Sequence, residues 1–154
     1  MHDFNIDINH ITRVEGHGNI VIDVKGGVIR ELRMEIVESP RFFEAMALGR
    51  SYKEVAHITS RICGICAVTH TTTSIKAIES ALGFEPSAQT IQLRKLLLHA
   101  EFIQSHILHL YFLTAPDFFG VASVFGMVKD NKETVLRGMR LKTVANDLCA
   151  LVGG

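Results

Sequence analysis

The residues most able to do chemistry are Cys63 and Cys66, which lie in the segment Arg61-Ile62-Cys63-Gly64-Ile65-Cys66-Ala67-Val68-Thr69-His70. Two thiols separated by two residues, with a glycine that lets the backbone turn tightly between them, can bind one metal ion or form one disulfide. A histidine, His70, stands four positions after the second cysteine. The segment therefore predicts a site built on sulfur, which the rest of the chain has to position.

Three kinds of sulfur site are compatible with this segment. A structural zinc site would use Cys63, Cys66 and His70 with His57 or Cys149 as the fourth ligand, although the sequence has no second closely spaced ligand pair. A thioredoxin-like dithiol would directly follow a strand, whereas the pattern before these cysteines is helical. The third is half of a thiolate site for a redox transition metal, with the other half elsewhere. An isolated C-x-x-C does not distinguish among them.

Composition narrows the class of protein. The 154 residues are enough for one domain with a substantial core, and 47% hydrophobic with 21% charged residues is typical of a globular chain. Sixteen basic residues balance sixteen acidic ones, which excludes a charge-driven partnership with nucleic acid or anionic lipid. An odd count of three cysteines favours a reducing, cytoplasmic setting over a secreted disulfide scaffold. We expect no export signal and no membrane span, because no run reaches roughly 18 to 20 apolar residues.

Hydrophobic periodicity predicts an antiparallel sheet at the amino end. Residues 4–8 and 20–24 alternate apolar and polar side chains with the two-residue period of a half-buried strand, and residues 28–37 form a third run. Gly26-Gly27 between the last two runs favours a two-residue hairpin turn, because both positions of such a turn favour positive φ.

From Ser39-Pro40 onward the period becomes helical. Helices are expected to end at Gly49, to cover residues 52–59, to run from the cysteine segment to Leu82, to cover 86–114 and to run from about 129 to 152. The free N–H groups at the start of the third helix would lower the pKa of a cysteine there and favour the thiolate. The overall prediction is an α+β fold, with the sheet over residues 1–38 and a packed helical bundle over 39–154.

The two long helices carry further expectations. The fourth helix is apolar on most sides, as a central helix is, and Ala115-Pro116-Asp117 should break it before an apolar connector over 118–125. Its polar residues more often serve as satisfied core or interface groups than as ligands; they are His99, Glu101, His106 and His109. The last helix should bury a stripe made of Leu136, Met139, Val144, Leu148 and Leu151. So much apolar helical surface indicates an incomplete or obligately associated chain.

Two carboxylates outside the cysteine segment have alternative interpretations. Glu15 lies in a polar, glycine-containing loop between the first two strands, where it is either a solvated turn residue or a group brought to a buried site. Glu44 lies among apolar residues of the first helix, where it is either a surface acid or a buried metal or hydrogen-bond ligand. Pattern alone does not separate these alternatives.

At this point the motifs show a resemblance to a known family. Thr12-Arg13-Val14-Glu15-Gly16-His17 together with Arg61-Ile62-Cys63-Gly64-Ile65-Cys66-Ala67-Val68-Thr69-His70 resembles the amino-terminal signature of the nickel-iron hydrogenase large subunit. Supporting matches are Pro40-Arg41-Phe42-Phe43-Glu44, Ser105-His106-Ile107-Leu108-His109 and Ala115-Pro116-Asp117. The form Arg41-Phe42-Phe43-Glu44 departs from the R-G-F-E of many membrane-bound and periplasmic enzymes and is similar to cytoplasmic cofactor-linked or heterodisulfide-reductase-linked groups.

The resemblance implies roles for individual residues. Cys63 would be a terminal nickel ligand and Cys66 a thiolate that bridges nickel and an iron carrying carbon monoxide and cyanide, metals that suit soft thiolates. His70 would hydrogen-bond a bridging sulfur, and Glu15 would accept the proton when dihydrogen, the substrate, is cleaved. Glu44 would bind a magnesium ion.

The resemblance also implies what must come from elsewhere. The family's second cysteine pair, D-P-C-x-x-C-x-x-H, is absent from these residues, so we expect the missing carboxy-terminal half of the large subunit to supply two more thiolates. The other implied partners are a maturation chaperone and an iron-sulfur small subunit. Two alternatives remain: a non-catalytic relative similar to the quinone-site subunit of complex I, and a small zinc-binding interaction module.

Overall fold

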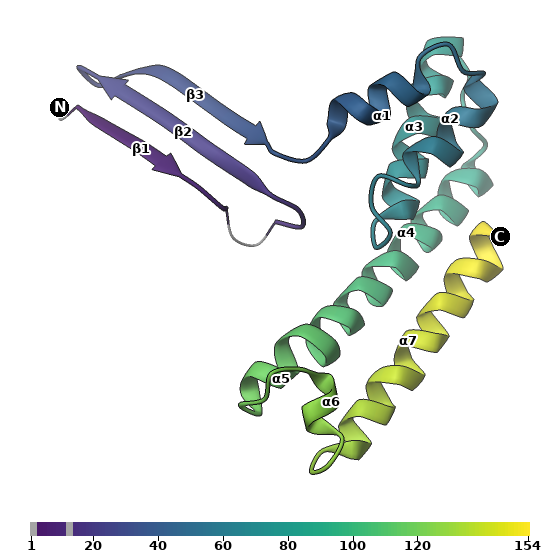
Figure 1. Cartoon of the computed structure of the whole chain (residues 1–154). Coiled ribbons are helices and arrows are strands. Elements are labelled where there is room, and N and C mark those ends of the chain that lie inside the picture. The colour runs from purple at the N-terminus through teal and green to yellow at the C-terminus, as the bar shows by residue number, and fades with distance from the viewer. Residues whose placement is uncertain (1–2, 12–13) are drawn as a thin grey trace. The chain divides into compact units, whose positions relative to one another are not determined.

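A computed structural model describes residues 3–11 and 14–154, so Thr12 and Arg13 of the first motif lie outside the described residues. The chain forms two compact units, Met1–Gly49 and Arg50–Gly154. The first holds the three strands and one helix, and the second holds the other helices (Figure 1). The expected α+β class is confirmed. The boundary between the two units follows the first helix, so that helix is grouped with the sheet.

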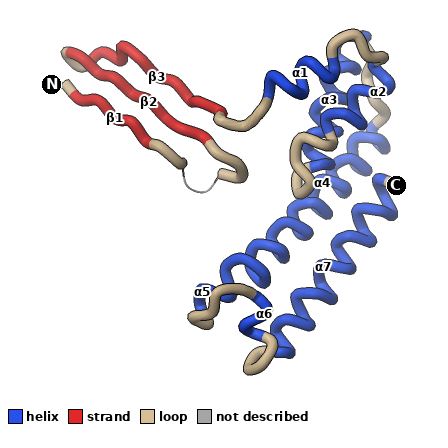
Figure 2. Tube along the Cα trace, viewed as in Figure 1, coloured by secondary structure: helices blue, strands red, loops and turns tan. Residues whose placement is uncertain are grey.

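The sheet is antiparallel with the strand order β1-β2-β3 (Figure 2). Its strands are β1 (Phe4–Ile8), β2 (Gly18–Lys25) and β3 (Val28–Ile36). The expected hairpin turn is confirmed, because Gly26 and Gly27 adopt φ of 57° and 77°. Such values cost glycine nothing and would strain other residues. The Asp3 carboxylate accepts a hydrogen bond of 2.7 Å from the N–H of Gly26 and holds β1 beside the turn.

The two faces of the sheet differ in chemistry. On one face the paired positions form apolar rows across all three strands: Phe4, Val24 and Ile29; Ile6, Ile22 and Leu32; Ile8, Ile20 and Met34. Most of these side chains are exposed or half-buried, and Leu32 is 66% exposed. The other face carries charge, and there Arg33 bridges Glu31 and Glu35. The alternation predicted from the sequence is therefore present, but of these nine side chains only that of Val24 is buried.

The short helices start and end where local sequence signals predict. They are α1 (Pro40–Ala47), α2 (Tyr52–Thr59) and α3 (Ala67–Leu82). Ser51 and Glu54 form a capping box at the start of α2, in which each side chain accepts a backbone N–H. Gly83 ends α3 in the left-handed conformation with φ of 64°.

The fourth helix does not break at Ala115-Pro116-Asp117, so that prediction is wrong. Helix α4 (Ala88–Leu108) continues as a π-helix, η1 (His109–Thr114), into α5 (Ala115–Phe118). Proline lacks an N–H and its ring clashes with the carbonyl four residues earlier, which disfavours a regular α-turn there. The wider turn of η1 immediately before Pro116 accommodates both effects. The chain turns only after Phe118, at Gly120, and α6 (Val124–Met127) interrupts the expected connector.

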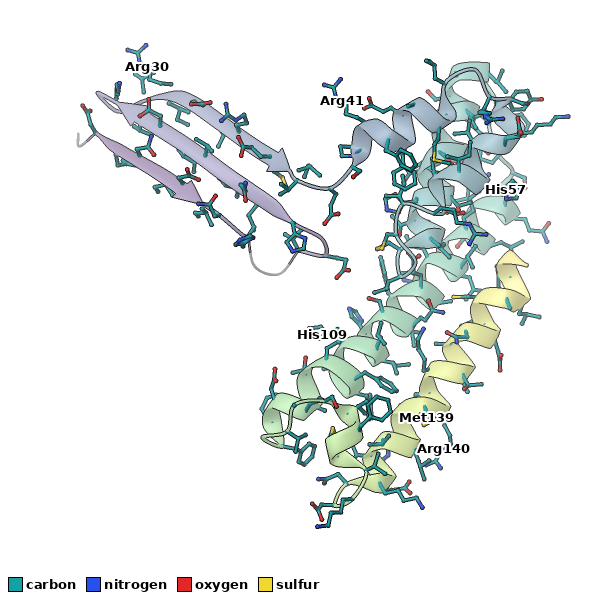
Figure 3. All side chains as sticks on the ribbon, in the orientation of Figure 1. Arg30, Arg41, His57, His109, Met139 and Arg140 are labelled. Carbon is teal, nitrogen blue, oxygen red and sulfur yellow. A yellow bond between two sulfur atoms is a disulfide. The ribbon has the colours of Figure 1, made fainter. Side chains whose placement is uncertain are left out.

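Helix α7 (Lys132–Gly153) lies beside α4 and buries a different stripe from the predicted one (Figure 1). Its buried residues are Val135, Gly138 and Ala145. The predicted stripe was wrong for Leu136, Met139, Val144 and Leu151, which are exposed, whereas Leu148 is half-buried. Met139, labelled in Figure 3, is 53% exposed. The small residues Gly138 and Ala145 let the backbones of α4 and α7 approach closely, and this close approach decides which side of α7 faces α4.

Helix α4 is also less covered than a central helix would be. Its buried residues are Ala100, Glu101 and Ile107. Other large apolar side chains of α4 stay exposed, including Leu93, Phe102 and Ile103 at 45–48%. Among the described residues no helix has both the length and the apolar character needed to cross a membrane.

A two-point ion pair fastens the carboxyl end of α3 to α4. Arg94 Nη1 lies 2.8 Å from Glu79 Oε2, and Nη2 lies 2.6 Å from Oε1. The side chains of Arg94 and Glu79 are 24% and 14% exposed. The hydrogen bonds from Arg94 hold the pKa of Glu79 below its ordinary value, and Glu79 raises the pKa of Arg94.

We predict that the Glu79–Arg94 pair makes stability depend on pH. Because the pKa of folded Glu79 is lowered, its contribution is complete above its ordinary value of 4.5 and is lost as pH falls through the lower, folded value. Thermal unfolding followed by circular dichroism should show Glu79→Gln less stable than wild type near neutral pH, with the difference shrinking below about pH 4.5. Glu133→Gln, which removes the exposed pair with Arg140, should change the melting temperature less. A constant Glu79→Gln difference down to strongly acidic pH would contradict the prediction.

We predict that Gly138→Ala destabilises the α4–α7 contact. A Cβ at Gly138 would lie 2.8 Å from both Cβ and Cγ of Tyr111 in η1, too close for that ring to stay in place. The overpacking should cost about 1–3 kcal/mol, more than the gain of about 1 kcal/mol in helix propensity. Gly153→Ala in the same helix is the control, because its Cβ would meet only the flexible end of the Leu97 side chain at 3.1 Å. Equal unfolding free energies for the two variants in urea would refute the prediction.

Candidate functional site

The loop between α2 and α3 brings the two cysteines together. Their Cα atoms lie 5.2 Å apart, and the structure joins Cys63 Sγ to Cys66 Sγ as a disulfide. The N–H of Cys66 donates a hydrogen bond of 3.2 Å to Cys63 Sγ, and Cys66 is the residue immediately before α3, with no side-chain hydrogen bond to the helix. Both residues are half-buried. The two-residue spacing thus brings the two sulfurs together, as the sequence predicts. The disulfide has to be reduced before either sulfur can bind a metal as a thiolate.

The donor set around the sulfurs is incomplete. Within residues 3–11 and 14–154 no three His, Cys, Asp or Glu side chains converge to hold a metal ion. A closed zinc site made of Cys63, Cys66, His70 and His57 or Cys149 is therefore not assembled by the described residues. His57, labelled in Figure 3, is an exposed residue of α2. Two adjacent sulfurs without further protein ligands fit half of a thiolate site, with the remaining ligands supplied by other residues.

His70 lies one turn into α3, at a position on the same side of the helix as Cys66. Its backbone N–H donates to the Cys66 carbonyl over 3.1 Å, and its side chain is half-buried. The helix is tied here to the end of α2, because Thr59 Oγ1 donates to the Ser74 hydroxyl over 3.0 Å. The cysteine loop is therefore held at both of its ends.

Glu101 of α4 is the one buried charged side chain in the described part of the chain, 4% exposed. Its Oε1 accepts a 2.7 Å hydrogen bond from the N–H of Val68, and its Oε2 accepts a 3.1 Å bond from the N–H of Thr69. The Thr69 hydroxyl also donates to Oε2. The prediction of a satisfied core group is confirmed for this residue. Glu101 caps α3 from a different helix, a role that the sequence analysis did not foresee.

One sequence signal could have led to this contact. Helix α3 begins without a side-chain cap and without an acidic residue in its first turn, which leaves its first N–H groups needing an acceptor from elsewhere. The expectation that these N–H groups would be free to favour the cysteine thiolates is wrong for Val68 and Thr69. A carboxylate already accepts from both of them.

Cys149, on α7, is not part of the disulfide. Burial raises the pKa of its thiol, the negative charge of Glu101 raises it further, and Lys142 lowers it in part. The raised pKa disfavours the Cys149 thiolate, which is the form of cysteine that binds metals.

Glu15 and Glu44 belong to the first unit, and both side chains are exposed. Glu15 lies in the loop that joins β1 to β2, which a 2.9 Å hydrogen bond from the Ile11 N–H to the Gly18 carbonyl closes. The structure describes these two carboxylates within their own unit and the cysteines within the other.

Beside Glu15, the loop is fixed by a contact with the segment that follows β3. Glu38 Oε1 accepts a hydrogen bond from the His17 N–H and lies 3.0 Å from His17 Nδ1. The hydrogen bond with the His17 side chain is the main cause of the lowered pKa of Glu38. Gly16 adopts φ of 85°, which favours glycine at this position.

The chain is similar to known proteins over nearly its whole length. A family model described as nickel-dependent hydrogenase matches residues 41–147, and one described as HoxL-like matches residues 5–38. The alpha chain of sulfhydrogenase 2 from Pyrococcus furiosus is 42% identical over 149 residues, which cover 97% of this chain and 36% of that protein. The F420-non-reducing hydrogenase of Methanothermobacter thermautotrophicus has a subunit that is 34% identical over 153 residues, with coverage of 94% and 32%.

A solved structure gives the same similarity in three dimensions. The crystal structure of an NAD+-reducing NiFe hydrogenase in the H2-reduced state matches with a TM-score of 0.69 and 32% identity, covering 97% of this chain and 35% of that one. The chain therefore spans about a third of the length of the relatives it matches.

Proposed function

This chain belongs to the nickel-dependent hydrogenase family, and we propose that it is the amino-terminal part of a nickel-iron hydrogenase large subunit. In this proposal it contributes half of the thiolate ligands for the reversible heterolytic cleavage of dihydrogen to protons and electrons. The observation that carries the proposal is the family match over residues 41–147, which includes the whole cysteine segment. The resemblance found in the sequence is thereby confirmed at the level of the family.

The proposed metal ligands are the two cysteines of the loop. Cys63 would bind nickel terminally, and Cys66 would bridge nickel to an iron that carries carbon monoxide and cyanide. The adjacency of the two sulfurs supports this assignment, because one metal ion can reach both when the pair is reduced. When bound, the cluster supplies the centre at which dihydrogen is activated. The two remaining thiolates come from outside these residues.

The other assignments concern residues that hold or move protons and ions. Glu15 would receive a proton on its carboxylate, and its exposed position in a loop leaves the carboxylate accessible to a donor. His70 would donate a hydrogen bond from its ring to a bridging sulfur, in keeping with its place one turn after Cys66. Glu44 would bind magnesium, a role that an exposed carboxylate can fill with ligands from other segments.

The proposed partners are those that an incomplete site requires. Sheet residues 1–38 and helical residues 39–154 would form one part of the large subunit, and its carboxy-terminal half would complete it. An iron-sulfur small subunit would take the electrons, and a maturation chaperone would engage the cysteine segment. Exposed apolar groups support such partners, including Phe118 and Phe125, each 84% exposed, and the apolar sheet face. The proposed setting is cytoplasmic.

The test is the metal content of a complex that contains this chain, purified without oxygen and under reducing conditions. We expect nickel and iron in equal amounts, with infrared bands of carbon monoxide and cyanide. Cys63→Ser and Cys66→Ser should each abolish nickel binding, because each removes a thiolate. Cys149→Ser is the matched control and should keep the nickel.

Two results would contradict the proposal. A complex without nickel would favour a non-catalytic relative similar to the quinone-site subunit of complex I. One zinc per chain, with folding lost on addition of a chelator, would favour a zinc-binding module.

A further inference from the structure

We propose that Glu101 is a positioning residue for the Cys63–Cys66 pair. Through its hydrogen bonds to the first turn of α3, Glu101 fixes the cysteine loop and sets the electrostatic potential at the two sulfurs. Its effect on the sulfurs is independent of any metal. Only the consequence for metal ligands rests on the proposed function.

The first step of the argument is geometric. Val68 and Thr69 are the second and third residues of α3, and the loop that carries both cysteines enters the helix at Cys66. Hydrogen bonds of 2.7 and 3.1 Å from their N–H groups reach a single carboxylate, and the Thr69 hydroxyl adds another bond. Three donors from one helical turn fix both the position and the rotation of the helix start. The cysteine loop is therefore fixed by Glu101, which follows Val68 by 33 positions and Thr69 by 32.

The second step concerns what α3 would do without Glu101. The helix has no side-chain cap of its own and no acid in its first turn, so without Glu101 its first N–H groups would have no acceptor within the described residues of that turn. The buried Glu101 carboxylate in turn needs hydrogen-bond donors, because burying a charge without them is costly. Glu101 finds them at the start of α3, and the described residues leave no buried side-chain nitrogen or oxygen without a partner. The contact satisfies both groups at once.

The third step is electrostatic. The amino end of a helix carries a partial positive charge, which stabilises a nearby thiolate and makes a dithiol easier to keep reduced. The Glu101 carboxylate occupies this end and cancels that effect. Its negative charge already reaches another thiol, since it contributes to the raised pKa of Cys149. Glu101 therefore shifts the Cys63–Cys66 pair away from the reduced thiolates and makes the sulfurs more electron-rich donors when they are reduced.

The test measures the dithiol–disulfide equilibrium of the full chain in glutathione buffers without added metal. In this exchange one oxidised glutathione disulfide is cleaved, the Cys63–Cys66 bond forms, and two reduced glutathione molecules are released. Glu101→Gln keeps the shape and an acceptor oxygen but removes the charge. It should lower the equilibrium constant for disulfide formation by about three- to tenfold, because the helix end then favours the thiolates.

Two controls separate this role from a purely structural one. Glu79→Gln removes the other carboxylate that ties α3 to α4, at the far end of the helix from the cysteines, and should leave the equilibrium constant within about twofold of wild type. Glu101→Asp keeps the charge and should restore a value near wild type. An unchanged constant in Glu101→Gln, or an equal change in Glu79→Gln, would overturn the proposal.

A second measurement covers the case in which Glu101→Gln does not fold. In the wild-type chain the amide hydrogens of Val68 and Thr69 should exchange with solvent at least about tenfold more slowly than those of Glu133 and Thr134. The Glu101 carboxylate accepts hydrogen bonds from the Val68 and Thr69 amides, whereas Glu133 and Thr134 lie in the first turn of α7, which has no side-chain cap. Equal exchange rates would overturn the proposal. Neither measurement depends on nickel, so absence of nickel from the complex would refute the proposed function and leave this inference standing.

Discussion

The contact between a buried carboxylate and an uncapped helix end determines how the cysteine loop is held. Helix α3 begins at the residue after Cys66, and its first N–H groups have no acceptor in their own turn. Glu101 supplies one from α4, and it needs those donors as much as they need it, because an isolated buried carboxylate is costly. At the other end of α3 the Glu79–Arg94 pair prevents the helix from pivoting. With both ends fixed, the position of the sulfurs follows from the position of α4.

The two compact units differ in how they are stabilised. The helical unit is tied internally by ion pairs, capping contacts and close backbone packing, as at Gly138 against Tyr111. The sheet unit offers a loop with an exposed carboxylate, Glu15, and an apolar face that its own strands leave largely exposed. The helical unit is therefore stabilised by its own contacts, whereas the sheet unit leaves most of its apolar surface exposed.

The parts of the fold that local rules control could be predicted from the sequence. Strand alternation, the Gly26-Gly27 turn and the stop at Gly83 follow from backbone preferences, and the helix starts near Pro40 and Tyr52 follow from capping signals. The cysteine pair could be predicted as well, since adjacency follows from its spacing. In all these cases the cause lies within a few residues of the effect.

The predictions that failed depended on distant residues. The buried side of α7 is set by how closely Gly138 approaches Tyr111, so hydrophobicity alone selected the wrong stripe. The helix survives Pro116 because the preceding turn widens, a choice that the proline does not itself encode. The cap of α3 comes from Glu101, 33 residues after Val68, and the uncapped start of α3 indicates the need for an acceptor but not which residue supplies it.

The contacts that shape the cysteine loop all join residues that precede α7 in the chain. The pair Glu79–Arg94 is separated by 15 residues and the pair Val68–Glu101 by 33, and Thr59 reaches Ser74 over 15. Closing loops of this size is rapid, and domains begin to fold while synthesis continues. The hairpin of α3 and α4 can thus form before α7 packs against α4. The cysteine loop would then reach its final geometry early in folding, without waiting for the last helix.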